Sequence, residues 1–234
     1  MSRLVTYDLT NGVATISMDD GKANALSLAM LGELHGALDR VVAEEGAVIL
    51  TGRGGIFSGG FDLNLIGSGN AQTLEMIDLG FSFAVRLLEH PAPVVIACNG
   101  SAVAMGAILL LCGDFRIGVN GPYKFVTNEV SIGLPMPWAG IEICRHRLAP
   151  RFFSRAINLS ESFSPVEGVA AGYIDRTIEP DGLEEFAKAK AVELASLHRL
   201  AFLTTKQRIH ETALSAIRRG ITRDREDFKH FIVS

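Results

Sequence analysis

The chain has 234 residues and a net charge of −4, which leaves no basic footprint for a nucleic-acid partner. Hydrophobic residues make up 48% of it and charged residues 21%, so it can bury a large core as one domain or as a domain with an appendage. Because no apolar run reaches about 18 residues, we expect no membrane-spanning helix. Met1–Arg3 leads directly into strand-like sequence, so we expect a cytoplasmic protein without a signal peptide.

Strands and helices alternate in the predicted structure up to about residue 178. Apolar or β-branched runs mark the expected strands, at residues 4–9, 13–18, 47–50, 94–98, 123–126 and 173–178. Apolar residues at helical spacing mark the expected helices, at residues 28–41, 74–89, 108–112 and, as two short helices broken at Pro150, 139–158. This order is typical of an α/β core of repeated ββα turns.

Short local signals predict where several of these elements begin and end. Asn11-Gly12 is a hairpin turn signal between the first two strands. Ser27 can cap the first helix, and Ser164–Glu167 has the form of a capping box with proline at the first helical position. Gly172 is expected to stop that later helix before the last strand.

A helical tail follows the α/β part. From Leu183 to Phe231 the sequence predicts three amphipathic helices, divided near Arg199 and Gly220. Their apolar faces need a partner to cover them.

The stretch Pro93–Glu129 has the order expected of a site that stabilises negative charge. The strand Val94–Cys98 ends at the turn signal Asn99-Gly100, small residues follow, and Ile108–Cys112 is apolar enough to be a buried helix. Such a turn aims backbone N–H groups and the positive end of a helix dipole at one point. That arrangement suits an anion or a developing oxyanion.

A carboxylate closes this stretch. Glu129 follows the last of these strands and neighbours the apolar Val130, Ile132 and Leu134. A carboxylate in apolar surroundings has a raised pKa, which is the usual condition for a catalytic base. Glu129 is therefore the candidate base.

Three segments in order resemble the crotonase superfamily, the enoyl-CoA hydratases and isomerases. They are Ala47–Gly52 running into Phe57–Leu63, Pro93–Gly100 with its glycine-bearing turn, and Cys112–Ile117 with the segment through Glu129 to Pro135. The resemblance implies a crotonase-like ββα spiral core that binds acyl-CoA, over residues 1–180, and a C-terminal helical oligomerisation region over 181–234. It also implies a homotrimer or a dimer of trimers, in which the last helices pack on neighbouring subunits.

The chemistry that the resemblance implies is stabilisation of a thioester enolate. Backbone N–H groups at Phe61 and Met105 would form an oxyanion hole for the thioester oxygen while a carboxylate removes a proton next to the carbonyl. Hydratases carry two glutamates, of which the second matches Glu129 and the first would fall at Ile108. A single carboxylate that takes a proton from C2 and returns it at C4 needs no water. The expected function is therefore a Δ3 to Δ2 shift of the double bond in enoyl-CoA.

Two other functions stay open. An enoyl-CoA hydratase would need a second acid from elsewhere, and Asp62 and Glu142 are the nearest candidates by sequence. A non-catalytic acyl-CoA-binding protein would keep the pocket and lose turnover.

Two departures from the family pattern affect the shape of the acyl pocket. Met105 stands where many members carry glycine and can narrow the pocket, and Met136–Gly140 replaces a glycine-rich stretch.

The resemblance also implies which residues contact the substrate. These are Lys22, Ala23, Ala25, Phe61, Asp62, Leu63 and Asn64 for the CoA part, and Met105 and Ile108 for the acyl part. Coenzyme A belongs to the substrate, so no separate cofactor is expected. The three cysteines are expected to be buried free thiols, and the six histidines lack the spacing of a metal site. Asp114 is expected to be structural, as a cap or a tie between strands.

Overall fold

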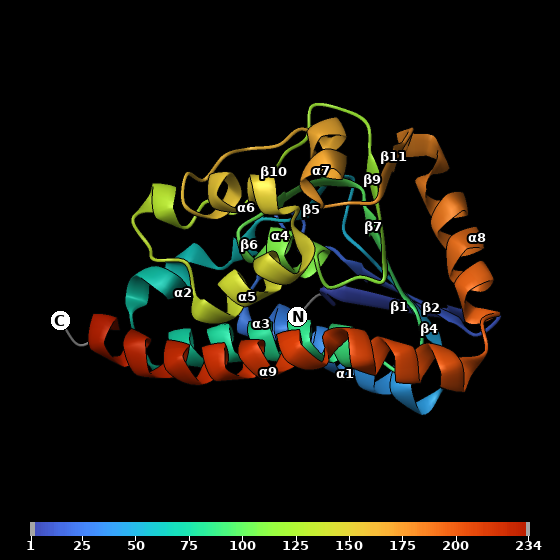
Figure 1. Cartoon of the computed structure of the whole chain (residues 1–234), viewed down its shortest axis with the longest axis horizontal. Coiled ribbons are helices and arrows are strands. Elements are labelled where there is room, and N and C mark those ends of the chain that lie inside the picture. Colours follow the sequence, from blue (N-terminus) through green and yellow to red (C-terminus); the bar gives the residue numbers. More distant parts are fainter. Residues whose placement is uncertain (1–2, 233–234) are drawn as a thin grey trace.

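The computed structural model describes residues 3–232, with side chains placed for residues 3–227. A six-stranded sheet in the order β1-β2-β4-β7-β9-β11 forms one layer (Figure 1). Its strands are β1 Val5–Thr10, β2 Val13–Met18, β4 Ala47–Thr51, β7 Val94–Cys98, β9 Phe115–Val119 and β11 Arg176–Ile178. Neighbouring strands pair in parallel, except that β1 and β2 form the predicted antiparallel hairpin. Asn11 and Gly12 at its turn have φ of 53° and 74°, as a type I′ turn requires.

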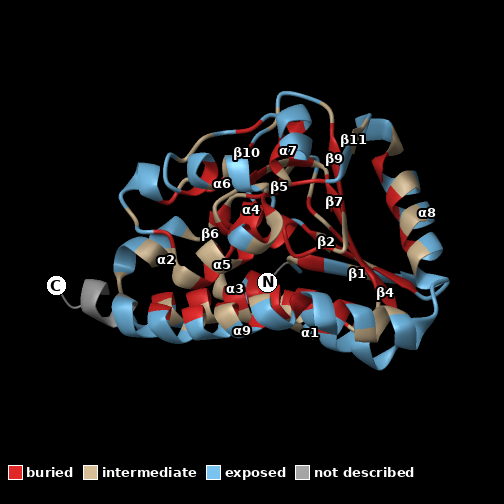
Figure 2. Cartoon of the chain, in the orientation of Figure 1, coloured by how far each residue is buried: buried red, intermediate tan, exposed pale blue. Residues whose placement is uncertain are grey.

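The central strands are covered on both faces, which explains why their sequences are continuously apolar (Figure 2). Ala47 and Ile49 of β4 belong to the cluster that packs with α8 (Leu183–Ala195). The alternate residues Val48 and Leu50 belong to the main core, which includes the inner faces of α1 (Leu28–Ala43) and α3 (Ala71–Glu89). Ser27 caps α1 as predicted, since its Oγ accepts a hydrogen bond from the Met30 N–H at 3.2 Å.

Two smaller sheets carry the segments near the candidate site. β10 (Phe125–Val126), β8 (Gly100–Val103) and β5 (Gly55–Ser58) form one, and β3 (Ala25–Leu26) pairs with β6 (Gly60–Phe61) in the other. The buried helix α4 (Met105–Leu110) follows β8 directly. The strand and the buried helix predicted between residues 94 and 112 are thus confirmed. The small residues between them form β8 rather than a plain turn, and the helix begins three residues earlier than predicted.

Shorter helices connect these layers. They are α2 Leu63–Ser68, the 3-10 turn η1 Val130–Ile132, α5 Trp138–Arg147, α6 Pro150–Ile157, α7 Pro165–Ala171 and the 3-10 turn η2 Pro180–Gly182. The predicted break at Pro150 is confirmed. So is the capping box before α7, where the Ser164 and Glu167 side chains each accept a backbone N–H of the other residue. Gly172 ends α7 with a φ of 93°.

The tail contains two helices within the described residues, so the prediction of three was wrong. α9 (Arg199–Ile232) continues through Gly220 without a break. Gly220 lets α9 cross the start of α5 closely, because a Cβ there would lie 2.7 Å from the backbone nitrogen of Ala139. In this chain α8 covers the large sheet and α9 runs along α3 and α5 (Figure 1). The boundary at residue 180 and the oligomeric state stay predictions.

Candidate active site

A pocket of about 440 Å³ lies between α3, α4 and the segment that follows β10. Its volume is within the range of small-molecule sites. Its apolar walls consist of Phe61, Ile66, Ile77, Phe81, Ile108, Leu134, Pro135 and Pro137. Glu129 is the only carboxylate among the described residues that line it. The pocket therefore suits an apolar ligand that meets a single acid or base.

Glu129 is buried, and its pKa is raised to the range that proton transfer near neutral pH requires. Its residue is 9% exposed, and its Oε2 is buried without a hydrogen-bond partner among the described residues. Burial raises the pKa of Glu129 from 4.5 to about 7, against a smaller lowering effect of its own backbone N–H. Such a carboxyl can both accept and return a proton at neutral pH.

The apolar surroundings of Glu129 come from other elements than its sequence neighbours. From the sequence, these surroundings were attributed in part to Val130 and Ile132. These two residues are 44% and 47% exposed, so that attribution was wrong for them. Ile108 of α4 lines the pocket beside Glu129 instead. Burial, and then the charge of Glu129, raise the pKa of the Cys144 thiol in α5.

The backbones of the two predicted oxyanion donors come from segments in direct contact. A Cβ at Gly60 would lie 2.8 Å from Ala104 Cβ and 3.2 Å from the backbone nitrogen of Met105. Phe61 follows Gly60 directly, so its N–H and that of Met105 belong to adjoining pieces of chain. Met105 is the first residue of α4, where the N–H has no preceding helical turn to bond.

The backbone of Ala104, directly before α4, has strained dihedral angles. Its φ of 50° and ψ of −127° lie in a region that glycine tolerates and that L-residues avoid. The bend that brings the Met105 N–H toward Gly60 occurs at this residue. Strain of this kind is found where a functional group must be aimed.

The side chains of the two donors lie differently. The Phe61 ring lines the pocket, meets the Phe81 ring edge-on at 6.3 Å, and fills the space that a Cβ at Gly80 would need. The Met105 side chain is buried in the main core and does not line the pocket. The predicted narrowing of the acyl pocket by Met105 is therefore not seen.

Neither candidate for a second acid lines this pocket. Asp62 caps α2, since its Oδ1 accepts a hydrogen bond from the Asn64 N–H at 2.9 Å. Glu142 lies on α5 and pairs with Arg145 at 3.5 Å. Ile108, which the resemblance matches to the first hydratase glutamate, lines the same pocket as Glu129, so an aliphatic side chain stands where a second acid would be needed.

The loop predicted to bind CoA is organised by Asp20. Its carboxylate accepts hydrogen bonds from the backbone N–H groups of Lys22, Asn24 and Ala25 at 2.7–2.9 Å. Although burial opposes it, these N–H groups keep the pKa of Asp20 below its ordinary value. The Ala23 carbonyl accepts the Gly59 N–H at 2.8 Å, so the loop lies beside β6. Lys22 is exposed, and Leu63 and Asn64 are exposed in α2.

Two other expectations, on Asp114 and on the cysteines, are met by the structure. Asp114 ties strands, because its Oδ2 accepts the Val94 N–H at 2.8 Å and also pairs with Lys206 at 2.6 Å. All three cysteines are buried and free.

Within the described chain, no group of three or more His, Cys, Asp or Glu side chains is placed to hold a metal ion. No helix in the part of the chain that was searched is both long and apolar enough to span a membrane.

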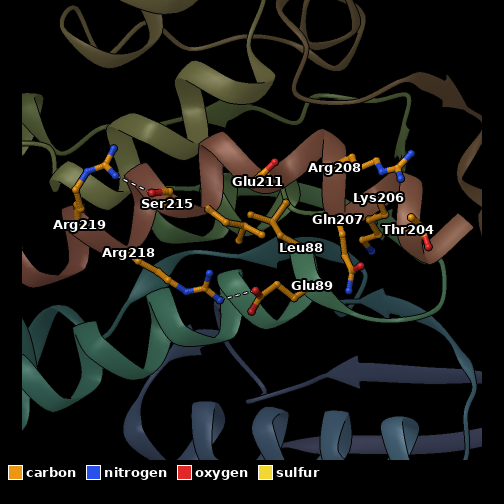
Figure 3. Close-up of a pocket in the computed structure, with 11 residues that line it drawn as sticks. Leu88, Glu89, Thr204, Lys206, Gln207, Arg208, Glu211, Ser215, Arg218 and Arg219 are labelled. Carbon is orange, nitrogen blue, oxygen red and sulfur yellow. Dashed lines mark hydrogen bonds and ion pairs between the residues drawn. The ribbon is translucent and has the colours of Figure 1, made fainter.

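A larger hollow, of about 770 Å³, lies along α9 and is lined by charged side chains (Figure 3). Three cations of this hollow have partners: Arg218 pairs with Glu89, Lys206 pairs with Asp114, and Arg219 donates a hydrogen bond to the Ser215 hydroxyl. Its other charged side chains, Arg208 and Glu211, are exposed, and none of the described residues that line this hollow carries a buried unpartnered polar atom like that of Glu129. The apolar pocket is therefore the candidate active site.

Comparison with known proteins places this site in a family. The family model described as enoyl-CoA hydratase/isomerase matches residues 8–234. The chain belongs to this enoyl-CoA hydratase/isomerase family. It is thus an enzyme of the crotonase superfamily, which acts on acyl-CoA thioesters, and the predicted crotonase-like fold is confirmed.

The proteins that this chain resembles include both an enoyl-CoA isomerase and a probable enoyl-CoA hydratase. It is 27% identical to mitochondrial enoyl-CoA delta isomerase 1 of Mus musculus, over 98% of this chain and 81% of that protein. It is 32% identical to a probable enoyl-CoA hydratase of Rhodobacter capsulatus, over 88% of this chain and 80% of the relative. A structure described as an enoyl-CoA isomerase from Mycobacterium tuberculosis matches with a TM-score of 0.92 at 41% identity, covering 96% of this chain and 98% of that one, and a second structure of the same protein is described as a probable enoyl-CoA hydratase.

Sequence reasoning missed much of the pocket wall. Thr73, Ile77 and Phe81 recur every four residues on α3 and form one side of the pocket. The periodicity shows that these residues share a helix face. It does not show which cavity that face borders, because the opposite wall comes from residues 108 and 129–137.

Proposed function

We propose that this enzyme shifts the double bond of an enoyl-CoA from Δ3 to Δ2, with Glu129 as its single acid and base. The observation that carries the proposal is one unpartnered carboxylate, of raised pKa, in an apolar pocket that Ile108 also lines. Glu129 would remove the C2 proton and return it at C4. The proton removed and the proton delivered are then equal in number, and no water is consumed.

The backbone around Gly60 and Ala104 supports a place for the enolate oxygen. If the N–H groups of Phe61 and Met105 hold the thioester oxygen, they stabilise the charge that develops when the C2 proton leaves. Loss of one such donor costs roughly 3–4 kcal/mol in a typical enzyme. We place the CoA part along the loop of Lys22, Ala23 and Ala25 and the start of α2, and we expect no cofactor besides the CoA of the substrate.

Hydration of 2-enoyl-CoA would need a second group to position and ionise water. The carboxylates of Asp62 and Glu142 have other partners and do not line the pocket, which favours isomerisation over hydration. A protein that only binds acyl-CoA would gain nothing from a carboxylate buried at a cost in stability, which favours an enzyme over a binder.

Incubating the purified protein separately with a 3-enoyl-CoA and a 2-enoyl-CoA tests this proposal. Thioester products are followed by chromatography and mass. We expect conversion of the 3-enoyl-CoA to its 2-enoyl isomer without a gain of water. Efficient formation of 3-hydroxyacyl-CoA from the 2-enoyl-CoA would show a hydratase, and binding without conversion of either would show a binder.

A further inference from the structure

Helix α5, which borders the acyl pocket, has no capping side chain of its own. Its N-cap is Pro137, which makes no side-chain hydrogen bond. The first N–H groups of a helix need acceptors from elsewhere. The acceptor for the first two N–H groups of α5 is one residue far along the chain. Asp224 of α9 accepts hydrogen bonds from the Trp138 N–H at 2.7 Å and the Ala139 N–H at 3.0 Å.

Asp224 is buried between α9 and α5. It is only 4% exposed, although its side chain is a carboxylate. Burial and, to a lesser extent, the charge of Asp227 raise its pKa, while the two backbone N–H groups and Arg223 act in the opposite direction. One turn earlier on α9, Gly220 leaves no room for a side chain against Ala139, so α9 and the start of α5 are in close contact at two successive turns.

The segment that Asp224 holds is a wall of the pocket. Pro137 lines the pocket directly, one residue before Trp138. In the first turn of α5, a Cβ at Gly140 would lie 3.1 Å from Ile108 Cδ1 and 3.7 Å from Phe81 Cζ. Both of those side chains line the pocket. Movement of the start of α5 would therefore change the shape of the pocket on the side of Pro137, Ile108 and Phe81.

We propose that Asp224 is a positioning residue for substrate specificity, which fixes the Leu134–Pro137 wall by capping α5 from α9 and so sets affinity for longer acyl chains. The inference rests on the proposed acyl-CoA site. A short acyl group fills only the part of the pocket beside Glu129 and the backbone donors. A longer apolar chain also needs the wall that Asp224 holds.

The test compares binding of butyryl-CoA and decanoyl-CoA to the full chain by calorimetry, because saturated acyl-CoAs need no turnover. Asp224→Ala removes both acceptors, and Asp224→Asn keeps one. We expect Asp224→Ala to weaken decanoyl-CoA about ten-fold and butyryl-CoA by less than about two-fold, a difference of the size that a hydrophobic pocket can give. Asp224→Asn should fall between wild type and alanine.

Two controls separate positioning from stability. Asp227→Ala removes a carboxylate on the same helix that accepts a hydrogen bond from the Trp138 ring N–H at 2.9 Å rather than from the backbone of α5, and should leave the ratio of the two affinities unchanged. Val41→Ala destabilises the protein from the buried face of α1, away from the pocket. If Val41→Ala changes the ratio as much as Asp224→Ala does, or if Asp224→Ala weakens both ligands equally, the proposal is wrong.

Kinetics with matching 3-enoyl-CoAs gives a second measurement. A wall defect should raise KM for the long substrate and leave kcat for the short substrate close to wild type. If wild-type protein binds decanoyl-CoA but turns over neither substrate, the proposed isomerase function fails while the role of Asp224 is still decided by the affinity ratio. If wild type prefers butyryl-CoA over decanoyl-CoA, the wall does not serve longer chains and the inference is overturned.

Discussion

Glu129 gives the enzyme a pH dependence whose direction can be worked out. Its pKa of about 7 belongs to a carboxyl that must be ionised to accept the C2 proton. We therefore expect kcat/KM to fall about ten-fold per pH unit below pH 7 and to level off above it. The measurement is the pH profile of kcat/KM for the isomerisation of a 3-enoyl-CoA. A profile that is level down to about pH 5, as for an ordinary solvated carboxylate, would contradict the raised pKa.

Ala104 is the residue at which backbone strain can be measured. A residue held in such a region costs about 1–3 kcal/mol. Glycine removes that strain but gains about 0.4–1 kcal/mol of unfolded-state freedom. We expect Ala104→Gly to raise the free energy of unfolding by about 1 kcal/mol in urea titrations. Ala107→Gly, at an ordinary helical position of α4, should lower it by about 1 kcal/mol. Equal destabilisation by both changes would show that Ala104 is unstrained.

At the scale of elements, Gly220 supports close packing of α9 on α5. In an exposed helix Gly→Ala usually stabilises by about 1 kcal/mol. At Gly220 the new Cβ would meet backbone atoms of Ala139 at 2.7 and 2.9 Å, so we expect Gly220→Ala to destabilise by about 1–3 kcal/mol. Gly32→Ala in α1, where nothing lies within 4 Å, is the matched control and should stabilise. Urea unfolding measures both. Stabilisation by Gly220→Ala would mean that the contact is looser than described.

Elements with strong local signals could be predicted, and those defined by distant contacts could not. The Asn11-Gly12 hairpin, the Ser27 cap and the capping box before α7 depend on a few adjacent residues, and all are confirmed. The sequence does not predict β9, because its interior carries Arg116, a charge that is accommodated by Asp175 at 2.6 Å, 59 residues away. Gly220 has the local signal of a helix end, and the contact that explains it is with Ala139, far earlier in the chain.

At the scale of the whole molecule, the site is assembled from separate parts of the chain. Glu129 was predicted from its sequence context and Phe61 and Ile108 from the resemblance, and the structure brings all three to one pocket. The α3 wall and the Asp224 contact were not predicted, because neither follows from local periodicity. The environment of Glu129 shows the limit most clearly: its pocket is lined by residues of α3 and α4, whereas Val130 and Ile132 are exposed.

Assembly is a separate prediction at this scale. Leu197, Leu200 and Ile209 are 49%, 66% and 61% exposed around the first half of α9, and Val192 of α8 is 52% exposed. Exposed apolar side chains that form a contiguous patch are typical of an interface. Together with the family resemblance, they predict a trimer or a dimer of trimers. Sedimentation equilibrium at micromolar concentration should give at least the trimer mass. A stable monomer there would contradict the prediction.

The most direct test of the single-base mechanism is the turnover of Glu129→Gln on a 3-enoyl-CoA, measured beside its affinity for acyl-CoA. Glutamine keeps the size of the side chain but cannot accept the C2 proton. We therefore predict that kcat falls by about 10²–10⁴-fold while the affinity for acyl-CoA changes little. Circular dichroism confirms that the variant is folded before the rates are compared. Isomerisation at the wild-type rate by a folded Glu129→Gln protein would contradict the mechanism and place the base elsewhere.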